Sequence, residues 1–231
     1  MARVLITGAS AGLGLNTARA LTDAGHDVVV HARGSGRMPD WPKVVLGDLS
    51  DLQETRGVAE QAQEHGPFTA VIHNAGTMDP AHAFAVNVIA PYVLTALLER
   101  PERLIYLTSS MHRGGSDDLG RIGKRRVTYS DSKLYVTALS AAWATRWPGT
   151  VTHAVDPGWV PTRMGGSGAP DDLVAGHETQ TWLATADRID PSTGGYWHHR
   201  RTQDPHPAVT NGRFQQQLLD LLGPHTGVKP D

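Results

Sequence analysis

Tyr129 and Lys133 stand four positions apart in YSDSKLYVTAL, a stretch whose apolar spacing predicts a helix. Residues separated by four lie on one face of a helix, so the two side chains can act together. A tyrosine hydroxyl, with an ordinary pKa near ~10, is a poor acid or base at neutral pH, but a neighbouring ammonium stabilises its anion. The pair therefore predicts proton transfer at the Tyr129 oxygen, although without further motifs such a pair is more often two exposed side chains.

A glycine-rich turn, TGASAGLG, follows the first apolar run of the chain at residues 7–14. In the spacing of Gly8, Gly12 and Gly14, the glycines permit a tight turn, close approach of backbone to a pyrophosphate, and close packing of the next helix. The N-terminus of that helix would offer its N–H groups to the phosphates. No Gly-Lys-Ser/Thr follows, so the turn is not a Walker motif. It indicates a dinucleotide site, and the alternative is a turn that only connects two elements.

Short β-branched runs alternate with segments of helical spacing along the chain. The runs predict buried strands at residues 3–7, 27–31, 43–47, 69–73, 103–108 and 150–155. The helical segments lie at residues 15–24, 52–64, 81–98 and 129–147. This alternation predicts right-handed crossovers and a doubly wound parallel sheet in three layers, formed by one domain over residues 1–231. A break in periodicity after the last run predicts a substrate loop over about 157–180.

Composition excludes several classes of function. The net charge of -2 gives no basic field for nucleic acid, and the basic segment GKRR at residues 123–126 is local. Cysteine is absent, so neither disulfides nor a thiolate metal site can form. His198 and His199 are neighbours in an expected strand, where they point to opposite faces, so no metal is expected. No apolar run approaches the ~18 residues of a membrane helix, and we expect a cytoplasmic protein without membrane contact.

Read in order, these and further motifs resemble the short-chain dehydrogenases/reductases in their compact single-domain branch. The motifs beyond the glycine-rich turn are GDL (47–49), HNAG (73–76), VNVIAP (86–91), LTSS (107–110), YSDSK (129–133) and DPGWVPT (156–162). His73 departs from the family pattern, which has Asn there. The long connection at residues 111–128 is similar to that of the subgroup containing retinol dehydrogenases and bacterial oxidoreductases, whose substrates vary.

The resemblance implies a Rossmann-type fold and hydride transfer between a nicotinamide and a small carbonyl or alcohol substrate. Its catalytic residues would be Ser110, Tyr129, Lys133 and Asn87. Negative charge develops on the carbonyl oxygen, so a neutral hydroxyl donor is needed there. Ser110 is preferred over Ser109 because the second serine of such a pair usually holds this position, and Asn87 would support a proton path to Lys133. The cofactor-binding residues implied are Gly8, Ser10, Ala11, Gly12, Leu13, Gly14, Arg33, Asp48, Leu49, Asn74, Ala75, Gly76, Tyr129, Lys133, Pro157, Gly158, Val160 and Thr162.

The residues after the second expected strand indicate which dinucleotide binds. VVVHARGSGR offers no acid for a ribose 2′-hydroxyl, whereas Arg33 suits a 2′-phosphate, with Ser35 or Arg37 as helpers. Ala11 stands where many NADP-preferring relatives carry a base. We therefore expect NADP(H) to be preferred and NAD(H) to be possible.

Two other functions compete with this interpretation. A non-catalytic, redox-sensing regulator would bind the dinucleotide but typically lacks Tyr-x-x-x-Lys. A sugar-nucleotide epimerase is disfavoured by the glycine spacing and the short C-terminal region. We also expect a homodimer or homotetramer that pairs through the helix at 129–147, which carries Trp143 and Trp147, with the last strand near residues 195–198 closing a sheet edge. Trp159 and Met164 are candidate pocket walls.

Overall fold

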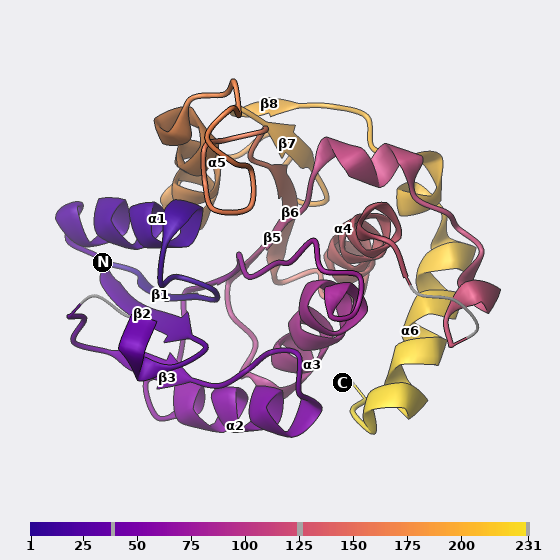
Figure 1. Cartoon of the computed structure of the whole chain (residues 1–231), viewed down its shortest axis with the longest axis horizontal. Helices are drawn as coiled ribbons and strands as arrows, with labels where there is room; N and C mark the ends of the chain where they lie inside the picture. The colour runs from indigo at the N-terminus through magenta and orange to yellow at the C-terminus, as the bar shows by residue number, and fades with distance from the viewer. Residues whose placement is uncertain (38–39, 124–126, 230–231) are drawn as a thin grey trace.

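The computed structural model of the chain describes residues 1–37, 40–123 and 127–229. Within these ranges the strands form one sheet, ordered β3-β2-β1-β4-β5-β6-β7-β8 (Figure 1). Residues 124–126 of the basic GKRR segment lie outside the described residues, as does the side chain of Arg37.

The strands are short, and the helices between them cover both faces of the sheet. The strands are β1 (Arg3–Ile6), β2 (Asp27–Ala32), β3 (Val44–Leu46), β4 (Ala70–His73), β5 (Arg103–Leu107), β6 (Val151–Asp156), β7 (Tyr196–His198) and β8 (Arg201–Thr202). The α-helices are α1 (Gly12–Asp23), α2 (Leu52–Gln63), α3 (Ala90–Leu97), α4 (Tyr129–Arg146), α5 (Leu173–Thr185) and α6 (Gly212–Thr226). Short helical turns lie at Ser35–Arg37, Ala85–Ile89, Ser110–Gly114, Leu119–Arg121 and Pro207–Thr210.

The sheet is doubly wound and has a switch point at its centre. β1 pairs in parallel with β2 on one side and with β4 on the other, and the pairing stays parallel out to β7. The chain runs outward from β1 in one direction and from β4 in the other, so the connections after these two strands diverge. Such a divergence leaves a crevice at the carboxyl ends of the strands.

Alternation along the strands builds two apolar layers. Val4 and Ile6 of β1 pack in the cluster that contains Leu21 of α1 and Leu183 of α5. Leu5 faces the other side, in the cluster formed with α2, α3, α4 and α6. Figure 1 shows α1 and α5 together on one face and α2, α3 and α4 on the other. The expected three-layer α/β fold is confirmed.

The expected substrate loop is too long at its C-terminal end. Asp172 accepts a hydrogen bond from the Ala175 backbone N–H and so caps α5, which begins at Leu173. Ala184 and Leu183 of this helix are buried against the sheet. The irregular segment therefore covers residues 157–172, and the remaining residues of the expected loop are helical.

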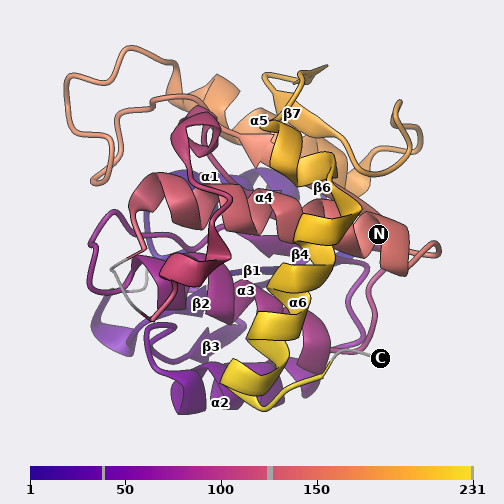
Figure 2. The same ribbon diagram turned by 90° about the vertical axis from the view of Figure 1, so that its right-hand side faces the viewer.

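Both tryptophans of the helix expected to pair with a second copy are buried within this chain. Trp143 is 0% and Trp147 is 3% exposed. Figure 2 shows α6 crossing over α4, and Phe214 of α6 lies 6.2 Å from Tyr135 of α4 between ring centroids. The chain covers this helix itself, because the amphipathic face of α6 packs onto it. The expected oligomer, with its pairing through this helix, stays a prediction.

The C-terminal edge of the sheet also differs from expectation. The strand expected to close the edge is β7, but β8 pairs antiparallel with it and lies outside it. In the described part of the chain, no helix is long and apolar enough to cross a membrane.

Gly14, the last residue of the glycine-rich turn, is closely packed and provides a stability test. A Cβ built on Gly14 would lie 2.5 Å from Asn74 Nδ2, 2.7 Å from the Gly8 carbonyl oxygen and 2.9 Å from Ala9 Cα. Gly14→Ala should therefore push α1 away from β1 and lower the free energy of unfolding by about 1–3 kcal/mol in urea denaturation.

Gly57→Ala is the matched control for that substitution. Gly57 lies inside α2, and a Cβ built on it meets nothing within 4 Å. Alanine is the better helix former, so this variant should gain up to ~1 kcal/mol of stability. Equal effects of the two substitutions would contradict the packing described for Gly14.

Candidate active site

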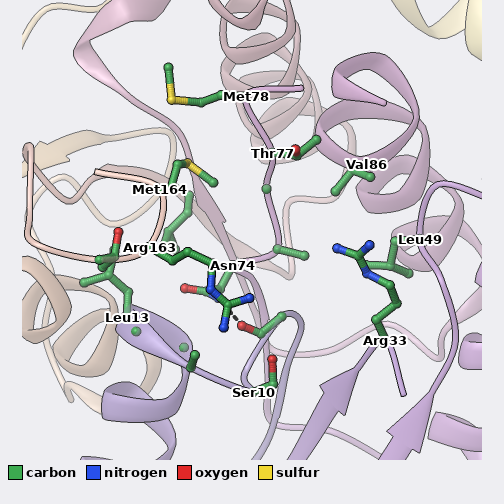
Figure 3. Close-up of a pocket in the computed structure, with 18 of the residues that line it drawn as sticks. Ser10, Leu13, Arg33, Leu49, Asn74, Thr77, Met78, Val86, Arg163 and Met164 are labelled. Carbon is green, nitrogen blue, oxygen red and sulfur yellow. Dashed lines mark hydrogen bonds between the residues drawn. The ribbon is translucent and has the colours of Figure 1, made fainter. Parts of the chain in front are cut away.

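A cavity of about 690 Å³ opens at the carboxyl ends of the central strands (Figure 3). Most of the residues expected from the sequence line it. They are Gly8, Ser10, Ala11, Gly12, Leu13, Gly14, Arg33, Asp48, Leu49, Asn74, Ala75, Gly76, Tyr129, Lys133, Pro157 and Thr162. The structure thus brings the glycine-rich turn and the tyrosine–lysine pair to one cavity.

Four expected residues do not line this cavity, and several unexpected ones do. Ser110, Asn87, Gly158 and Val160 lie outside its lining. Met164, a candidate pocket wall, also lines it, and the unexpected lining residues are His31, Gly47, Ser50, Thr77, Met78, Asp79, His82, Val86, Leu107, Thr108 and Arg163. Most of these follow β2, β3 or β4, or belong to the loop after β6, so the carboxyl-end geometry explains their position.

The glycine-rich turn is held against the end of β4 by side-chain hydrogen bonds. Asn74 Nδ2 donates to the carbonyl oxygens of Thr7 and Gly8, at 2.9 and 3.1 Å. The Ala75 backbone N–H donates to the Thr7 hydroxyl at 3.0 Å. Gly8 has a φ of 66°, and a Cβ built on it would lie 2.7 Å from Ala75 Cα. Only glycine fits here, and the turn stays open on the side that faces the cavity.

His31 supports the same turn from β2. The Gly8 backbone N–H donates to His31 Nδ1 at 3.0 Å, which leaves the proton on Nε2 to donate to the Gly47 carbonyl oxygen at 2.9 Å. Burial lowers the pKa of this imidazole, although the Gly47 hydrogen bond opposes that shift, so the ring is neutral. From the sequence, His31 counted only as one of the residues after the second expected strand that are not acidic. Nothing in its local pattern indicated this hydrogen-bonding role.

The N-terminus of α1 lacks a side-chain cap. Its N-cap residue is Ala11, which makes no capping hydrogen bond, and no acidic residue lies in the first turn. By contrast, Asp51, Thr128, Asp172 and Asn211 cap α2, α4, α5 and α6 with side-chain oxygens. The first N–H groups of α1 therefore suit an anion in the cavity. A glycine cradle and an uncapped helix fit the pyrophosphate of a dinucleotide.

Arg33 stands at the end of the cavity beside the acidic residue of the GDL motif. Its Nε lies 3.8 Å from Asp48 Oδ2, and the Arg33 side chain is 65% exposed. Burial alone would raise the pKa of the Asp48 carboxyl, but hydrogen bonds from Ser50 and the charge of Arg33 hold it below its ordinary value. The carboxylate is ionised, and the guanidinium keeps donors available on its exposed side.

Lys133 is buried at the opposite end of the cavity. Its Nζ donates to the Leu107 carbonyl oxygen at 2.9 Å and lies 5.6 Å from the centroid of the Tyr129 ring. Burial lowers the pKa of this ammonium to about 8, against a smaller opposing effect of the Asp156 charge. Lys133 is therefore charged at neutral pH and close to the tyrosine, as the four-residue spacing predicts.

Tyr129 is a protonated phenol in this structure. Burial raises the pKa of its hydroxyl to about 12, a side-chain hydrogen bond with Ser109 acts in the opposite direction, and the Asp156 charge adds to the rise. From the sequence, the neighbouring lysine was expected to lower the pKa of Tyr129. The structure gives a raised pKa instead, because desolvation is the larger effect. A phenol that holds its proton suits proton donation.

The structure places Ser109, rather than Ser110, beside the tyrosine. β5 ends at Leu107, and Ser109 is still extended, with φ -164° and ψ 151°, so its partly buried side chain is directed to Tyr129. Ser110 begins the short helix Ser110–Gly114 and is exposed. The expected catalytic role of Ser110 stays a prediction, and the hydrogen bond to Tyr129 makes Ser109 the alternative.

Asn87 braces the wall of the site and does not reach the cavity. It lies in the π-helical turn Ala85–Ile89, which the sequence analysis took as part of one long helix. Its Oδ1 accepts from the Thr77 backbone N–H at 2.8 Å, and its Nδ2 donates to the Thr77 carbonyl oxygen and to Ser132 Oγ, each at 2.9 Å. These bonds tie the segment after β4 to α4, and a role in proton transfer stays a prediction.

Asp156 is a charged residue of the site that sequence reasoning did not single out. It is 4% exposed at the end of β6, where it accepts from the Gly158 backbone N–H at 3.1 Å and from the Tyr196 hydroxyl at 3.2 Å. Its charge raises the pKa of both Tyr129 and Lys133. The sequence feature that could have identified Asp156 is an acidic residue directly before the Pro157–Gly158 turn.

His198 and His199 do not point to opposite faces of a strand as expected, because β7 ends at His198 and the two rings stack with their centroids 3.9 Å apart. His198 Nδ1 is 3.2 Å from the Asp156 carbonyl oxygen and 3.7 Å from its Oδ2. Among the described residues, no three His, Cys, Asp or Glu side chains are grouped as a bound metal ion would require.

Comparison with known proteins agrees with this geometry. Residues 2–172 match the family model of the short-chain dehydrogenases. The chain is similar to the short-chain dehydrogenase chyC of Penicillium rubens, with 38% identity over 99% of each chain.

Solved structures share the fold at low sequence identity. An uncharacterised protein from Mycobacterium paratuberculosis superposes with a TM-score of 0.84 at 21% identity, covering 100% of this chain and 95% of that one. A blue fluorescent protein from a metagenomic library, in complex with NADPH, gives a TM-score of 0.71 at 20% identity, covering 85% and 95%. The family match over most of the chain and the full-length relative establish that this protein belongs to the short-chain dehydrogenase family.

Proposed function

We propose that this protein is an NADP(H)-dependent oxidoreductase that transfers a hydride between the nicotinamide and a carbonyl or alcohol substrate. The observation that carries the proposal is one cavity with two ends of different chemistry. One end has the glycine cradle and the uncapped α1, and the other has Tyr129 and Lys133. A dinucleotide that lies along the cavity would bring its reactive ring to the tyrosine.

Arg33 supports NADP(H) over NAD(H). It follows β2 in the position where an NAD site commonly has an acid that binds the ribose 2′-hydroxyl. A guanidinium binds a phosphate dianion with charge-assisted hydrogen bonds, and no carboxylate from the end of β2 opposes it. The exposed side of Arg33 is therefore the proposed 2′-phosphate contact, and NAD(H) would bind without it.

The chain's own residues would manage the proton and the charge on the substrate oxygen. The bound nicotinamide supplies or accepts the hydride. Tyr129 holds a proton at neutral pH and would donate it to a carbonyl oxygen as that oxygen becomes negative. Ser109 donates a second hydrogen bond at this oxygen and orients the phenol, while the Lys133 ammonium stabilises the phenolate that is left behind.

The open part of the cavity favours a substrate with an apolar body. Met78 and Met164 line it with side chains that are 48% and 43% exposed (Figure 3). Methionine side chains are flexible and adapt to differently shaped apolar ligands. Trp159 is 60% exposed but does not line the cavity, and its Nε1 donates to the Gly165 carbonyl oxygen within the loop. We therefore propose apolar ketones or aldehydes, or the corresponding alcohols, as the substrate class.

Turnover separates this proposal from a non-catalytic sensor. The wild type should oxidise NADPH in the presence of members of a panel of apolar ketones and aldehydes, followed by absorbance. Tyr129→Phe removes the proton donor and little cofactor contact, so it should abolish turnover while the NADPH dissociation constant changes by less than about twofold. NADPH binding without turnover of any panel member would favour the sensor, and normal turnover by Tyr129→Phe would exclude the mechanism.

The two serines of the LTSS motif give a paired test of the site geometry. Ser109→Ala removes the hydroxyl beside Tyr129 and should lower kcat about 10²–10³-fold, the usual loss for one donor to a developing oxyanion. Ser110→Ala alters an exposed side chain and should keep kcat within about twofold. Steady-state kinetics on both variants measure this, and the reverse pattern would return the catalytic role to Ser110.

The lowered pKa of Lys133 makes the free energy of unfolding depend on pH, in a direction that can be predicted. Its pKa falls from 10.5 to about 8, so between these pH values the unfolded chain holds a proton that the folded chain has lost. The free energy of unfolding then rises with pH across this window, by up to about 3 kcal/mol in total at 1.36 kcal/mol per pKa unit. Urea denaturation of the wild type and of Lys133→Met at several pH values would measure this effect. Relative to the variant, the wild type should gain free energy of unfolding from about pH 8 to pH 10.5. A difference that stays constant with pH would show that the lysine pKa is not lowered.

A further inference from the structure

We propose that Arg163, from the loop after β6, binds the pyrophosphate of the dinucleotide and supplies the cation that the glycine-rich turn lacks. The inference rests on the proposed function, because it assumes a dinucleotide in the cavity. It differs from the assignment of Arg33, which concerns the 2′-phosphate at the other side of the same cavity.

The neighbours of Arg163 fix its place along the cavity. The Thr162 methyl group, Cγ2, would lie 3.2 Å from a Cβ built on Gly12, so this residue contacts the glycine-rich turn. Met164 Cε would lie 4.0 Å from a Cβ built on Gly76, close to Lys133 Nζ at 3.4 Å from the same point. Arg163 therefore stands between the turn that faces the phosphates and the end of the cavity that contains the lysine.

The loop is ordered by its own hydrogen bonds around Arg163. The Gly166 backbone N–H donates to the Thr162 carbonyl oxygen at 2.8 Å, and the Gly165 backbone N–H donates to the Thr162 hydroxyl at 3.2 Å. Trp159 Nε1 donates to the Gly165 carbonyl oxygen at 2.8 Å. The backbone on both sides of Arg163 is therefore in place before any ligand binds, which reduces the entropy lost on binding.

Arg163 lines the cavity with no charge partner in the described part of the chain. The other cations of the cavity are engaged, because Arg33 pairs with Asp48 and Lys133 donates to the Leu107 carbonyl oxygen. The first turn of α1 and its cap at Ala11 contribute backbone N–H groups but no charged side chain. A pyrophosphate carries two negative charges, so a guanidinium facing that turn complements it.

Position argues against Arg163 as a second ligand of the 2′-phosphate. Figure 3 shows the two guanidinium groups entering from opposite sides of the pocket, with Arg163 toward Asn74 and Ser10 and Arg33 toward Leu49. Thr162 keeps Arg163 near the start of α1, whereas Arg33 follows β2. The two arginines are therefore assigned to different phosphates of one ligand.

Direct binding to three ligands tests the assignment without using turnover. Dissociation constants of NADPH, NADH and adenosine 2′-monophosphate would be measured by calorimetry for the wild type, Arg163→Ala and Arg33→Ala. Arg163→Ala should weaken NADPH and NADH alike, by about ten- to a hundredfold, the range for a hydrogen bond to a charged group, and should leave adenosine 2′-monophosphate unchanged. Arg33→Ala should weaken NADPH and adenosine 2′-monophosphate but leave NADH within about twofold. Arg163→Lys, which keeps the charge, should recover part of the loss.

The outcomes separate this inference from the proposed function. If Arg163→Ala binds both dinucleotides as the wild type does, or loses affinity only for the two ligands with a 2′-phosphate, the pyrophosphate assignment is wrong while the proposed function stands. If the wild type binds neither NADPH nor NADH, the proposed function fails and the inference fails with it. Arg163 is exposed, so its substitution should leave the thermal unfolding midpoint unchanged, and a normal midpoint ties any loss of affinity to the lost guanidinium.

Discussion

The site depends on the hydrogen bonds that join the ends of β1 and β4. These strands pair in parallel as far as Ile6 and Ile72, and beyond that point their connections run in opposite directions, so the turn after β1 needs other bonds to the end of β4. The Asn74 amide supplies these bonds by donating to the Thr7 and Gly8 carbonyl oxygens. The same bonds satisfy backbone oxygens that the tight turn leaves without strand partners. The shape of the glycine cradle, the direction of α1 and the width of the cavity follow from this junction.

Burial sets the electrostatics at the catalytic end more than the tyrosine–lysine pair does. Desolvation raises the pKa of Tyr129 and lowers that of Lys133, so burial disfavours the charged form of both groups. Asp156 acts on both in the direction that keeps their protons bound. The site therefore favours a phenol and an ammonium together, which is the protonation state from which the proposed proton donation would start.

The sequence predicted the features that depend on local residue patterns. It did not predict the features that depend on contacts between segments far apart in the chain. β-branched runs and glycine spacing located β1 to β6 and the turn, because a buried strand and a left-handed Gly8 each need particular residue types. The choice between Ser109 and Ser110 depends on where an extended segment ends, which no residue type marks. The covering of Trp143 by α6 depends on a helix far along the chain, so its burial could not be separated from an exposed interface.

The proposed cofactor site combines elements that are far apart in sequence. In this proposal the glycine-rich turn offers backbone N–H groups, Arg33 follows β2, and the loop after β6 adds Thr162 and Arg163. Thr162 approaches Gly12, and Met164 approaches Gly76 beside Lys133. If the proposed function holds, changes in this loop would therefore affect both cofactor binding and the shape of the space where the substrate would lie.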